Sequence, residues 1–398
     1  MKTDAATSKL PDATLWLILA CGIVAALHLG KAAIAAPLLQ ADLQLGLTEV
    51  GWLAGIFAVL GLIGGAPVGI MAATFSNRRA VLLGLFTMAV SGIIGTIMPS
   101  YWTLLVSRLA EGFGFLLVIV GGPALLQSLS NGAKRDMALS LWSCFMPLGM
   151  ALAMLTGPLF QSWQAFWWAS SALGITVAVA VLSCVPGDKL SNAASERTGW
   201  RVCGELFSSA APLLAVSFAL YSLMFFALFS FLPVLLDERM SVSRASAGLL
   251  MALASAANAV GNLAAGYLLA KGAGRGPLIA VASAIMGGTG LAIFSGQFQP
   301  HTTLILCVLF SAVGGLIPAT LLASVPRLAS RSALVPIAVG LIMQGSNLGQ
   351  LLGPVIVGTV TTAYGWGAAG VVVGVTSVVG CAVAVLLQGS PDRQSKRL

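Results

Sequence analysis

Residues Leu15 to Leu39 read "LWLILACGIVAALHLGKAAIAAPLL", a stretch that contains no acidic residue and only two basic ones, His28 and Lys31. At roughly 1.5 Å per residue, a helix of this length crosses the hydrocarbon core of a bilayer. The stretch therefore predicts a membrane-spanning helix with a cation about two-thirds of the way along it.

The composition of the whole chain agrees with this first segment. Hydrophobic residues make up 58% of the sequence and charged residues only 8%, with a mean hydropathy of +0.98. Soluble domains carry about 25% charged residues, because their surfaces must face water. The composition thus excludes a water-soluble protein and predicts an all-α membrane protein with many spans.

Polar breaks divide the chain into apolar segments long enough to cross a membrane. An even number of spans places both termini on the same side. Twelve segments are predicted, at residues 15–39, 47–74, 80–98, 102–129, 137–161, 164–186, 208–236, 245–270, 277–296, 301–326, 334–360 and 366–388.

The distribution of Lys and Arg residues shows which side of the membrane holds the two termini. With the N-terminus inside, sixteen of the twenty lie in cytoplasmic segments, and the outer loops hold only Arg239 and Arg244. Positive charge accumulates on the cytoplasmic side of membrane proteins, so both termini are expected there. The polar stretch 187–207 is expected to be a cytoplasmic linker between a bundle at 1–186 and a bundle at 208–398.

The two predicted bundles are related by an internal repeat. Glycine and proline positions recur at spacings of 195 to 197 residues. A parallel six-plus-six repeat places a transport pathway between two bundles, with the site near mid-membrane. The matching pairs are Pro37 with Pro233, Gly51 with Gly248, Gly69 with Gly266, Pro123 with Pro318, and Gly157-Pro158 with Gly353-Pro354.

Three motifs resemble those of the major facilitator superfamily. The loop "GIMAATFSNRR" (69–79) keeps the glycine and the basic end of the loop after the second span, with Ala73 at the usual acidic position. The segment "SRLAEGFG" (107–114) matches Arg-x-x-x-Gly-x-Gly of the fourth span, and "PLGMALAMLTGP" (147–158) is similar to the glycine-proline motif of the fifth. Two longer stretches, "LWSCFMPLGMALAMLTGPLF" (141–160) and "GSNLGQLLGPVIVG" (345–358), look most like the cyanate and nitroimidazole transporter branch of this superfamily.

This resemblance implies two pseudo-symmetric six-helix bundles that alternate access to one central site. It also implies a gating role for the loop after the second span, and the glycine-proline pairs are expected to bend or hinge their helices. The predicted gating residues are Gly69, Arg78, Arg79, Gly157, Pro158, Gly353 and Pro354.

Ionisable residues inside spans are costly and normally face a cavity or a partner. Lys31 and His28 share one helix face, and the resemblance places that helix along the central cavity. Lys31 is predicted either to bind an anionic solute or to pair with Glu111. Arg108 lies three residues before Glu111, and this pair is predicted either to couple transport to protons or to lock the fourth span.

The second half offers neutral groups to a solute. Asn258 and Asn262 share one face of the eighth span, and Gln344 and Asn347 lie in the eleventh. Such amides either bind a solute or join helices. The aromatic residues Tyr221, Phe225 and Phe229, spaced by four in the seventh span, either pack or form a cavity wall, and the first two are counted as candidate binding residues.

The predicted function is secondary active transport of a small, anionic solute, coupled to protons or a counter-substrate as symport or antiport. No phosphate-cradling loop for ATP appears, no cofactor or metal is expected, and the sequence does not indicate an enzyme, a channel or a nucleic-acid partner. The alternative is proton-driven efflux of drugs or hydrophobic metabolites. The chain is expected to be a monomer in the bacterial inner (plasma) membrane, in contact with lipid.

Overall fold

The computed structural model describes residues 12–64, 76–130, 137–139, 141–142, 144–186, 210–240, 243–328 and 335–389, and within these ranges it contains helices and no strand. The first half holds α1 (Asp12–Ile34), α2 (Ala36–Leu43), α3 (Leu47–Gly55), η1 (Ile56–Ala58), α5 (Asn77–Ile97), α6 (Tyr101–Leu129), α8 (Phe145–Thr156), η2 (Gly157–Leu159) and α9 (Trp163–Cys184). The second half holds α11 (Ala211–Met240), α12 (Arg244–Ala270), α13 (Arg275–Ser295), α14 (Pro300–Gly314), α15 (Leu316–Leu328), α16 (Val335–Tyr364) and α17 (Trp366–Gly389).

The helices account for the predicted spans. Ten of those in the described ranges are long and apolar enough to cross a membrane. The short apolar helix Phe145–Leu159 and the long helix α16 bring the arrangement into agreement with twelve spans. The predicted linker 187–207 lies outside the described residues.

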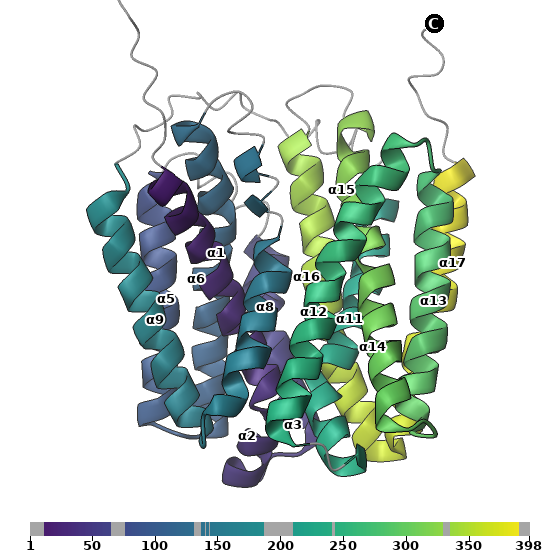
Figure 1. The fold of residues 1–398 in the computed structure, drawn as a ribbon, viewed down its shortest axis with the longest axis horizontal. Coiled ribbons are helices and arrows are strands. Elements are labelled where there is room, and N and C mark those ends of the chain that lie inside the picture. Colours follow the sequence, from purple (N-terminus) through teal and green to yellow (C-terminus); the bar gives the residue numbers. More distant parts are fainter. Residues whose placement is uncertain are drawn as a thin grey trace, which may run out of the picture.

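The two halves stand side by side, with α1 to α9 (purple to blue) on one side and α11 to α17 (green to yellow) on the other (Figure 1). The first residues of α1 and the last residues of α17 lie at the same end of the molecule (Figure 1). This is the arrangement that an even number of spans requires.

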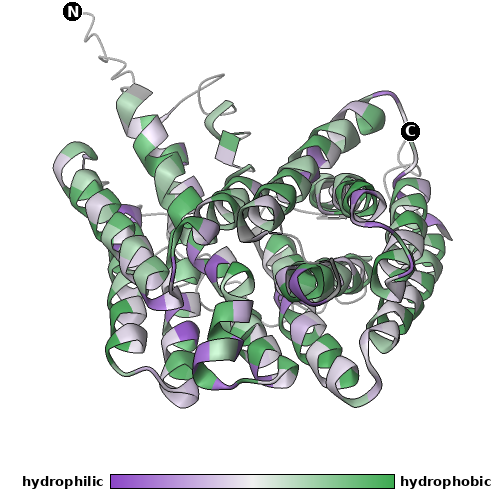
Figure 2. Ribbon diagram, turned by 60° about the horizontal axis from the view of Figure 1, so that its bottom comes forward, coloured by the Kyte–Doolittle hydropathy of each residue, from purple (hydrophilic) through white to green (hydrophobic). Residues whose placement is uncertain are grey.

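The outward faces of the helices are apolar. Hydrophobic residues predominate along the ribbon and strongly hydrophilic ones are few (Figure 2). Large side chains such as Trp102, which is 71% exposed, Phe86 and Ile97 point away from the core. A monomeric soluble protein would not expose so many, whereas a bilayer covers them.

The two main helix contacts between the halves, α3 with α16 and α8 with α12, are both built on glycine. On α3, Gly51 lies against the Pro354 carbonyl of α16, where an added Cβ would clash. On α12, Gly248 lies against Pro158 of η2 and the Met154 carbonyl of α8 in the same way. Since Gly51 matches Gly248 and Pro158 matches Pro354 in the repeat, the two contacts are pseudo-symmetric copies of one another.

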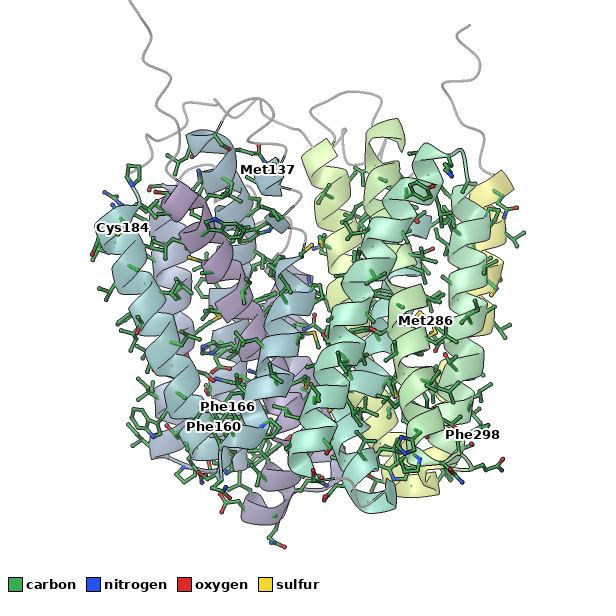
Figure 3. The ribbon with its side chains drawn as sticks, viewed as in Figure 1. Met137, Phe160, Phe166, Cys184, Met286 and Phe298 are labelled. Carbon is green, nitrogen blue, oxygen red and sulfur yellow. The ribbon has the colours of Figure 1, made fainter. Side chains whose placement is uncertain are left out.

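The halves are in contact at the end of the molecule away from the start of α1 and the end of α17. Thr48 and Thr362 share a hydrogen bond of 3.3 Å between α3 and α16. Phe160 and Phe166 lie near this end (Figure 3). A cavity between the halves is lined there by residues that include Pro37, Pro158, Phe160, Trp163, Pro233 and Asp237.

A second repeated feature secures this end within each half. Asp42, at the end of α2, accepts hydrogen bonds from Trp163 Nε1 (2.7 Å) and Gln164 Nε2 (2.8 Å) of α9. Glu238, near the end of α11, accepts one from Trp366 Nε1 (2.9 Å) of α17. In both halves a carboxylate at the end of the first span thus holds the indole at the start of the last span.

Candidate functional site

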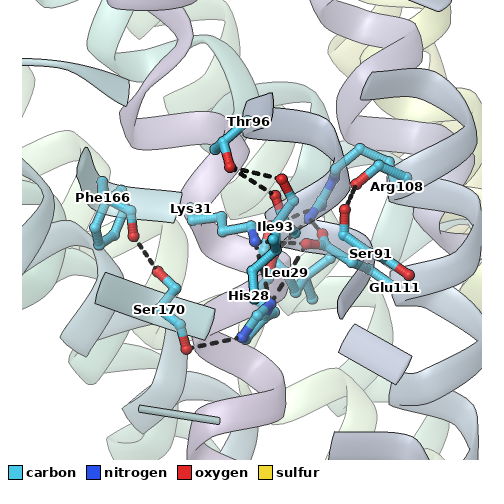
Figure 4. Close-up of polar contacts among 12 residues, drawn as sticks. His28, Leu29, Lys31, Ser91, Ile93, Thr96, Arg108, Glu111, Phe166 and Ser170 are labelled. Atoms are coloured by element: carbon cyan, nitrogen blue, oxygen red, sulfur yellow. Dashed lines mark hydrogen bonds and ion pairs between the residues drawn. The ribbon is translucent and has the colours of Figure 1, made fainter. Parts of the chain in front are cut away.

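Four ionisable side chains meet in the middle of the first half, and we refer to them as the charge cluster: His28 and Lys31 from α1, and Arg108 and Glu111 from α6 (Figure 4). Lys31 Nζ lies 2.5 Å from Glu111 Oε1, and Arg108 Nη1 lies 2.5 Å from Glu111 Oε2. One carboxylate is therefore shared by two cations, one on each oxygen.

Arg108 also binds the helix backbones around it. Its guanidinium donates hydrogen bonds to the carbonyls of His28 (2.6 Å), Leu29 (3.3 Å) and Leu53 (3.2 Å). Its Cζ lies 4.5 Å from the centre of the Phe57 ring in η1, a cation–π distance. The arginine therefore ties α1, α3 and α6 together while it holds the carboxylate.

The close approach that this requires depends on Gly112. A Cβ at this position of α6 would clash with the Phe57 carbonyl. Glycine thus lets α6 approach the segment where α3 passes into the tighter η1 turn, within reach of the Arg108 guanidinium.

Hydrogen bonding determines the tautomer of His28. Its Nε2 lies 3.2 Å from the Ser170 carbonyl oxygen of α9, which can only accept a hydrogen bond. The assignment that satisfies this contact puts the hydrogen on Nε2, so Nδ1 carries the lone pair. Lys31 Nζ, 3.1 Å away, donates to that Nδ1.

Residues of α5 and α9 close the cluster on its remaining sides. Lys31 Nζ lies 4.6 Å from the centre of a Trp167 ring. A Cβ on Gly92 of α5 would lie 2.6 Å from Ser171 Oγ, 3.1 Å from Glu111 Oε1 and 3.4 Å from Lys31 Nζ. Trp167 Nε1 and Ser171 Oγ are buried and have no hydrogen-bond partner among the residues that the structure describes.

Of the two alternatives for Lys31, the structure has the pairing with Glu111. The Lys31 side chain is 0% exposed, and so are His28 and Glu111. The anion-binding interpretation expected the ammonium to line a cavity. In this conformation it does not. Arg108 and Glu111 are in direct contact, as their spacing of three residues allows, and the role of the pair stays a prediction.

The candidate residues of the second half form a separate network. Asn258 Nδ2 donates to Tyr221 Oη (3.0 Å) and to the Ser311 carbonyl (3.1 Å), and Asn262 donates to Asn258 Oδ1 (3.0 Å). Phe225 stacks on Phe229 with ring centres 4.4 Å apart. These contacts join α11, α12 and α14 in the way that the helix-packing interpretation expects.

The amides of α16 lie at the contact between the halves. Gln344 Nε2 donates to the Leu62 carbonyl of the second span at 3.0 Å. Asn347 lies against Gly61, where an added Cβ would be 2.6 Å from its Oδ1. Within the described residues, no hydrogen bond joins either amide to the charge cluster, so the sequence candidates form three separate groups.

The predicted gating residues are distributed as follows. Gly69 lies outside the described residues. Arg78 donates to the Leu182 carbonyl of α9 at 2.5 Å, and Arg79 is exposed on α5. Gly157 packs on Ile34 of α1, and Gly353 packs on Leu223 of α11. Their proline neighbours form the glycine contacts between the halves described above.

Sequence reasoning missed the residues that complete the cluster, namely Gly92, Trp167, Ser170 and Ser171. Trp167 and Ser171 are one helical turn apart in the sixth span, and this spacing was the one available signal. It is a weak signal, because tryptophan and serine are common in membrane spans.

The repeated two-half bundle and a buried charge cluster define a multi-pass membrane carrier. The sequence profile of the Major Facilitator Superfamily matches residues 18–335, and the chain belongs to this superfamily. The 3-(3-hydroxy-phenyl)propionate transporter of Escherichia coli (strain K12) is 26% identical over 97% of this chain and 96% of its own length.

Two further proteins show how far the similarity extends. A probable 4-methylmuconolactone transporter of Cupriavidus pinatubonensis is 30% identical, over 34% of this chain and 33% of its own length. A crystal structure of a bacterial homologue of the human lysosomal transporter Spinster, inward-facing and occupied, superposes with a TM-score of 0.83 at 16% identity, covering 96% of this chain and 97% of that one. That likeness confirms the fold.

Proposed function

We propose that this chain moves a small organic anion through the membrane by alternating access, coupled to protons. The observation that carries the proposal is the charge cluster, which holds two cations and one carboxylate fully buried in a half-bundle. Ionisable groups at this depth are expensive, and their presence in carriers marks proton relays and substrate pathways. A structural ion pair needs only one cation for one carboxylate.

The excess positive charge favours a negatively charged cargo. With a neutral His28, the cluster has a formal charge of +1, and a nearby anion would compensate it. A relative that matches 97% of this chain is a transporter of 3-(3-hydroxy-phenyl)propionate, which is an aromatic carboxylate. Aromatic monocarboxylates are therefore the first class to test, ahead of inorganic anions such as cyanate.

The amides between the halves are proposed as the groups that reach the cargo. Gln344 is bonded to the Leu62 carbonyl of the opposite half, and Asn347 lies against Gly61. Separation of the second span from α16 would release the Gln344 amide from the Leu62 carbonyl. It would also uncover Asn347, whose Nδ2 donates to the Met343 carbonyl of its own helix and has a second N–H to offer a carboxylate. Tyr221, Phe225, Asn258 and Asn262 are proposed to form the neighbouring wall, where an aromatic cargo would stack.

The glycine-proline pairs are proposed as the moving contacts. Pro158 and Pro354 sit at the two contacts between the halves, each against a glycine of the opposite half, and Gly157 and Gly353 lie beside them. Such contacts suit the rocking of one half against the other. Gly69, Arg78 and Arg79 are proposed to act at the opposite, cytoplasmic gate.

The membrane arrangement follows from the positive residues. The chain is proposed to lie in the bacterial inner membrane as a monomer, with both termini cytoplasmic. Residues 1–186 and 208–398 are proposed as the two bundles, joined by the linker 187–207. We propose no enzymatic activity, no cofactor and no nucleic-acid partner.

The test is transport by the purified protein in proteoliposomes with an imposed pH gradient. Labelled 3-(3-hydroxyphenyl)propionate and a panel of small carboxylates are supplied outside, and Gln344→Leu with Asn347→Leu serves as the binding variant. We expect saturable, gradient-dependent uptake of at least one carboxylate and its loss in the double variant. Uptake of none of the panel would contradict the proposed cargo class.

Efflux of hydrophobic compounds is the second candidate, favoured by the aromatic column Phe218, Tyr221, Phe225 and Phe229, whose neighbouring ring centres lie 4.4 to 5.9 Å apart. The tetracenomycin C resistance and export protein of Streptomyces glaucescens is 25% identical over 43% of this chain and 32% of its own length. Lys31→Met separates the candidates, because anion transport should collapse while export of neutral compounds persists.

A further inference from the structure

The charge cluster presents an uneven charge count. Among the described residues, His28, Lys31, Arg108 and Glu111 are the only buried Asp, Glu, Lys, Arg or His side chains. The other elements packed around them contribute Phe57 from η1, Gly92 from α5, and Trp167, Ser170 and Ser171 from α9. None of these ionises in the ordinary pH range, so the four residues of the cluster alone set its net charge.

The count distinguishes the two ways in which this cluster can exchange a proton. Adding a proton to Glu111 would leave Lys31 and Arg108 as two buried cations with no anion between them. Removing a proton from Lys31 would leave the Arg108–Glu111 pair, with a formal charge of zero. Because buried charge without a partner is costly, the second exchange is strongly favoured.

We infer that Lys31, and not Glu111, is the group in this cluster that takes up and releases the coupled proton, while Glu111 stays ionised beside Arg108. This inference rests on the proposed proton coupling and names the residue that performs it. Lysine suits the task because its ammonium can lose a proton when buried, whereas the arginine guanidinium remains charged.

His28 acts as a positioning residue in this scheme. Its Nε2–H is committed to the Ser170 carbonyl, so its Nδ1 lone pair faces Lys31 Nζ at 3.1 Å. That lone pair holds the ammonium in line with Glu111. A protonated His28 would repel Lys31 and turn its Nδ1–H toward Glu111 Oε1, now 3.5 Å away, which would break the arrangement seen here.

The proton exchange is balanced as follows. When the helices rearrange and admit water, one N–H bond of the Lys31 ammonium breaks, its electron pair stays on Nζ, and the proton passes to that water. The charge of the cluster changes from +1 to zero. A carboxylate cargo is attracted only to the +1 form, so one proton and one carboxylate travel together as a neutral pair.

Infrared difference spectroscopy tests the assignment without any cargo. The whole purified protein in lipid nanodiscs is cycled between about pH 5 and about pH 10, a range that brackets the ordinary titration of Glu and Lys. We expect the wild type and Glu111→Gln to give the same protonated-carboxyl C=O signal. A carboxyl signal that is present in the wild type and missing in Glu111→Gln would overturn the inference.

Fluorescence of Trp167 follows Lys31 itself, because its ring lies 4.6 Å from Nζ. We expect a one-proton change in emission with pH in the wild type, absent in Trp167→Phe and in Lys31→Arg, which keeps a permanent charge. Lys31→Met is expected to abolish it too, and the arginine variant decides the matter if the methionine variant does not fold. A transition that survives in Lys31→Arg, or no transition in the wild type, would overturn the inference.

These results can be separated from failure of the proposed function. If Lys31 titrates but carboxylate uptake ignores the pH gradient, the proposed coupling fails although the assignment of the titrating group stands. If uptake follows the gradient and the Glu111 carboxyl signal appears, the coupling stands and the assignment to Lys31 fails.

Discussion

The charge count in the cluster makes a prediction about stability that does not depend on transport. Glu111→Gln removes the one carboxylate, among the described residues, that pairs with Lys31 and Arg108, at 2.5 Å from each. Removing one partner of a buried ion pair typically costs about 3–5 kcal/mol. For a unit the size of one half, this lowers the apparent melting temperature by roughly 6–20 °C.

Lys31→Met should behave very differently. It leaves the Arg108–Glu111 contact and the carbonyl bonds of Arg108 in place, and it removes the excess charge. Methionine fills much of the lysine volume, and replacing buried charge by a packed apolar side chain is often neutral. We expect a change of about 1 kcal/mol or less in either direction.

The assay is thermal unfolding of the detergent-solubilised protein, followed by tryptophan fluorescence. Glu49→Gln is the matched control, because it makes the same substitution on α3 at a residue outside the charge cluster. The control should melt with the wild type. Equal losses of stability in Glu111→Gln and Lys31→Met would refute the reasoning from charge balance.

Three further predictions address the packing around the site and between the halves. Gly92→Ala places a Cβ against the charge cluster, so it should lower the melting temperature and abolish carboxylate uptake. Unchanged values of both would show that the cluster has space for a methyl group. Trp163→Phe and Trp366→Phe each remove one hydrogen bond to an exposed carboxylate. Each substitution should lower the free energy of unfolding by about 0.5–1.5 kcal/mol. A loss of stability in only one of the two variants would contradict the equivalence of the two hydrogen bonds. In a cysteine-free background, Thr48→Cys with Thr362→Cys should form a disulfide readily, because the two hydroxyls lie 3.3 Å apart. The cross-link should block carboxylate uptake. Uptake that continues after cross-linking would show that α3 and α16 need not separate here during transport.

Much of the fold could be predicted from the sequence, because each span is an apolar run bounded by polar residues. The repeat was also visible, since Gly51 and Gly248 are 197 residues apart and Pro158 and Pro354 are 196 residues apart. Their meaning was not visible: they proved to be the two copies of one contact between the halves. Spacing along a chain shows equivalence, while the partner of each residue depends on how the halves pack.

The site was only partly predictable, for a physical reason. Arg108 and Glu111 are three residues apart on one helix, so their contact follows from helix geometry. Lys31 is separated from Glu111 by 80 residues, and its partner depends on the rotation of α1. In spans that are apolar on every face, hydropathy does not reveal rotation, so Trp167 and Ser170 of α9 could not be assigned to the cluster.

The two carboxylates that bind tryptophan indoles illustrate the same limit. Asp42 and Glu238 each follow a matched proline, Pro37 or Pro233, by five residues. In the sequence they look like ordinary polar residues at the ends of spans. Only the fold brings the last span of each half close enough for its first indole to reach them.

The most direct measurement of the central claim follows protons and cargo together. Proteoliposomes containing a pH-sensitive dye receive an unlabelled aromatic carboxylate that the protein transports, while the membrane potential is set separately with a potassium ionophore. The account predicts that protons enter with the carboxylate, one for one, that the flux does not respond to the potential, and that Lys31→Arg abolishes the proton movement. Carboxylate entry without a change in internal pH, or a flux that scales with the potential, would contradict it.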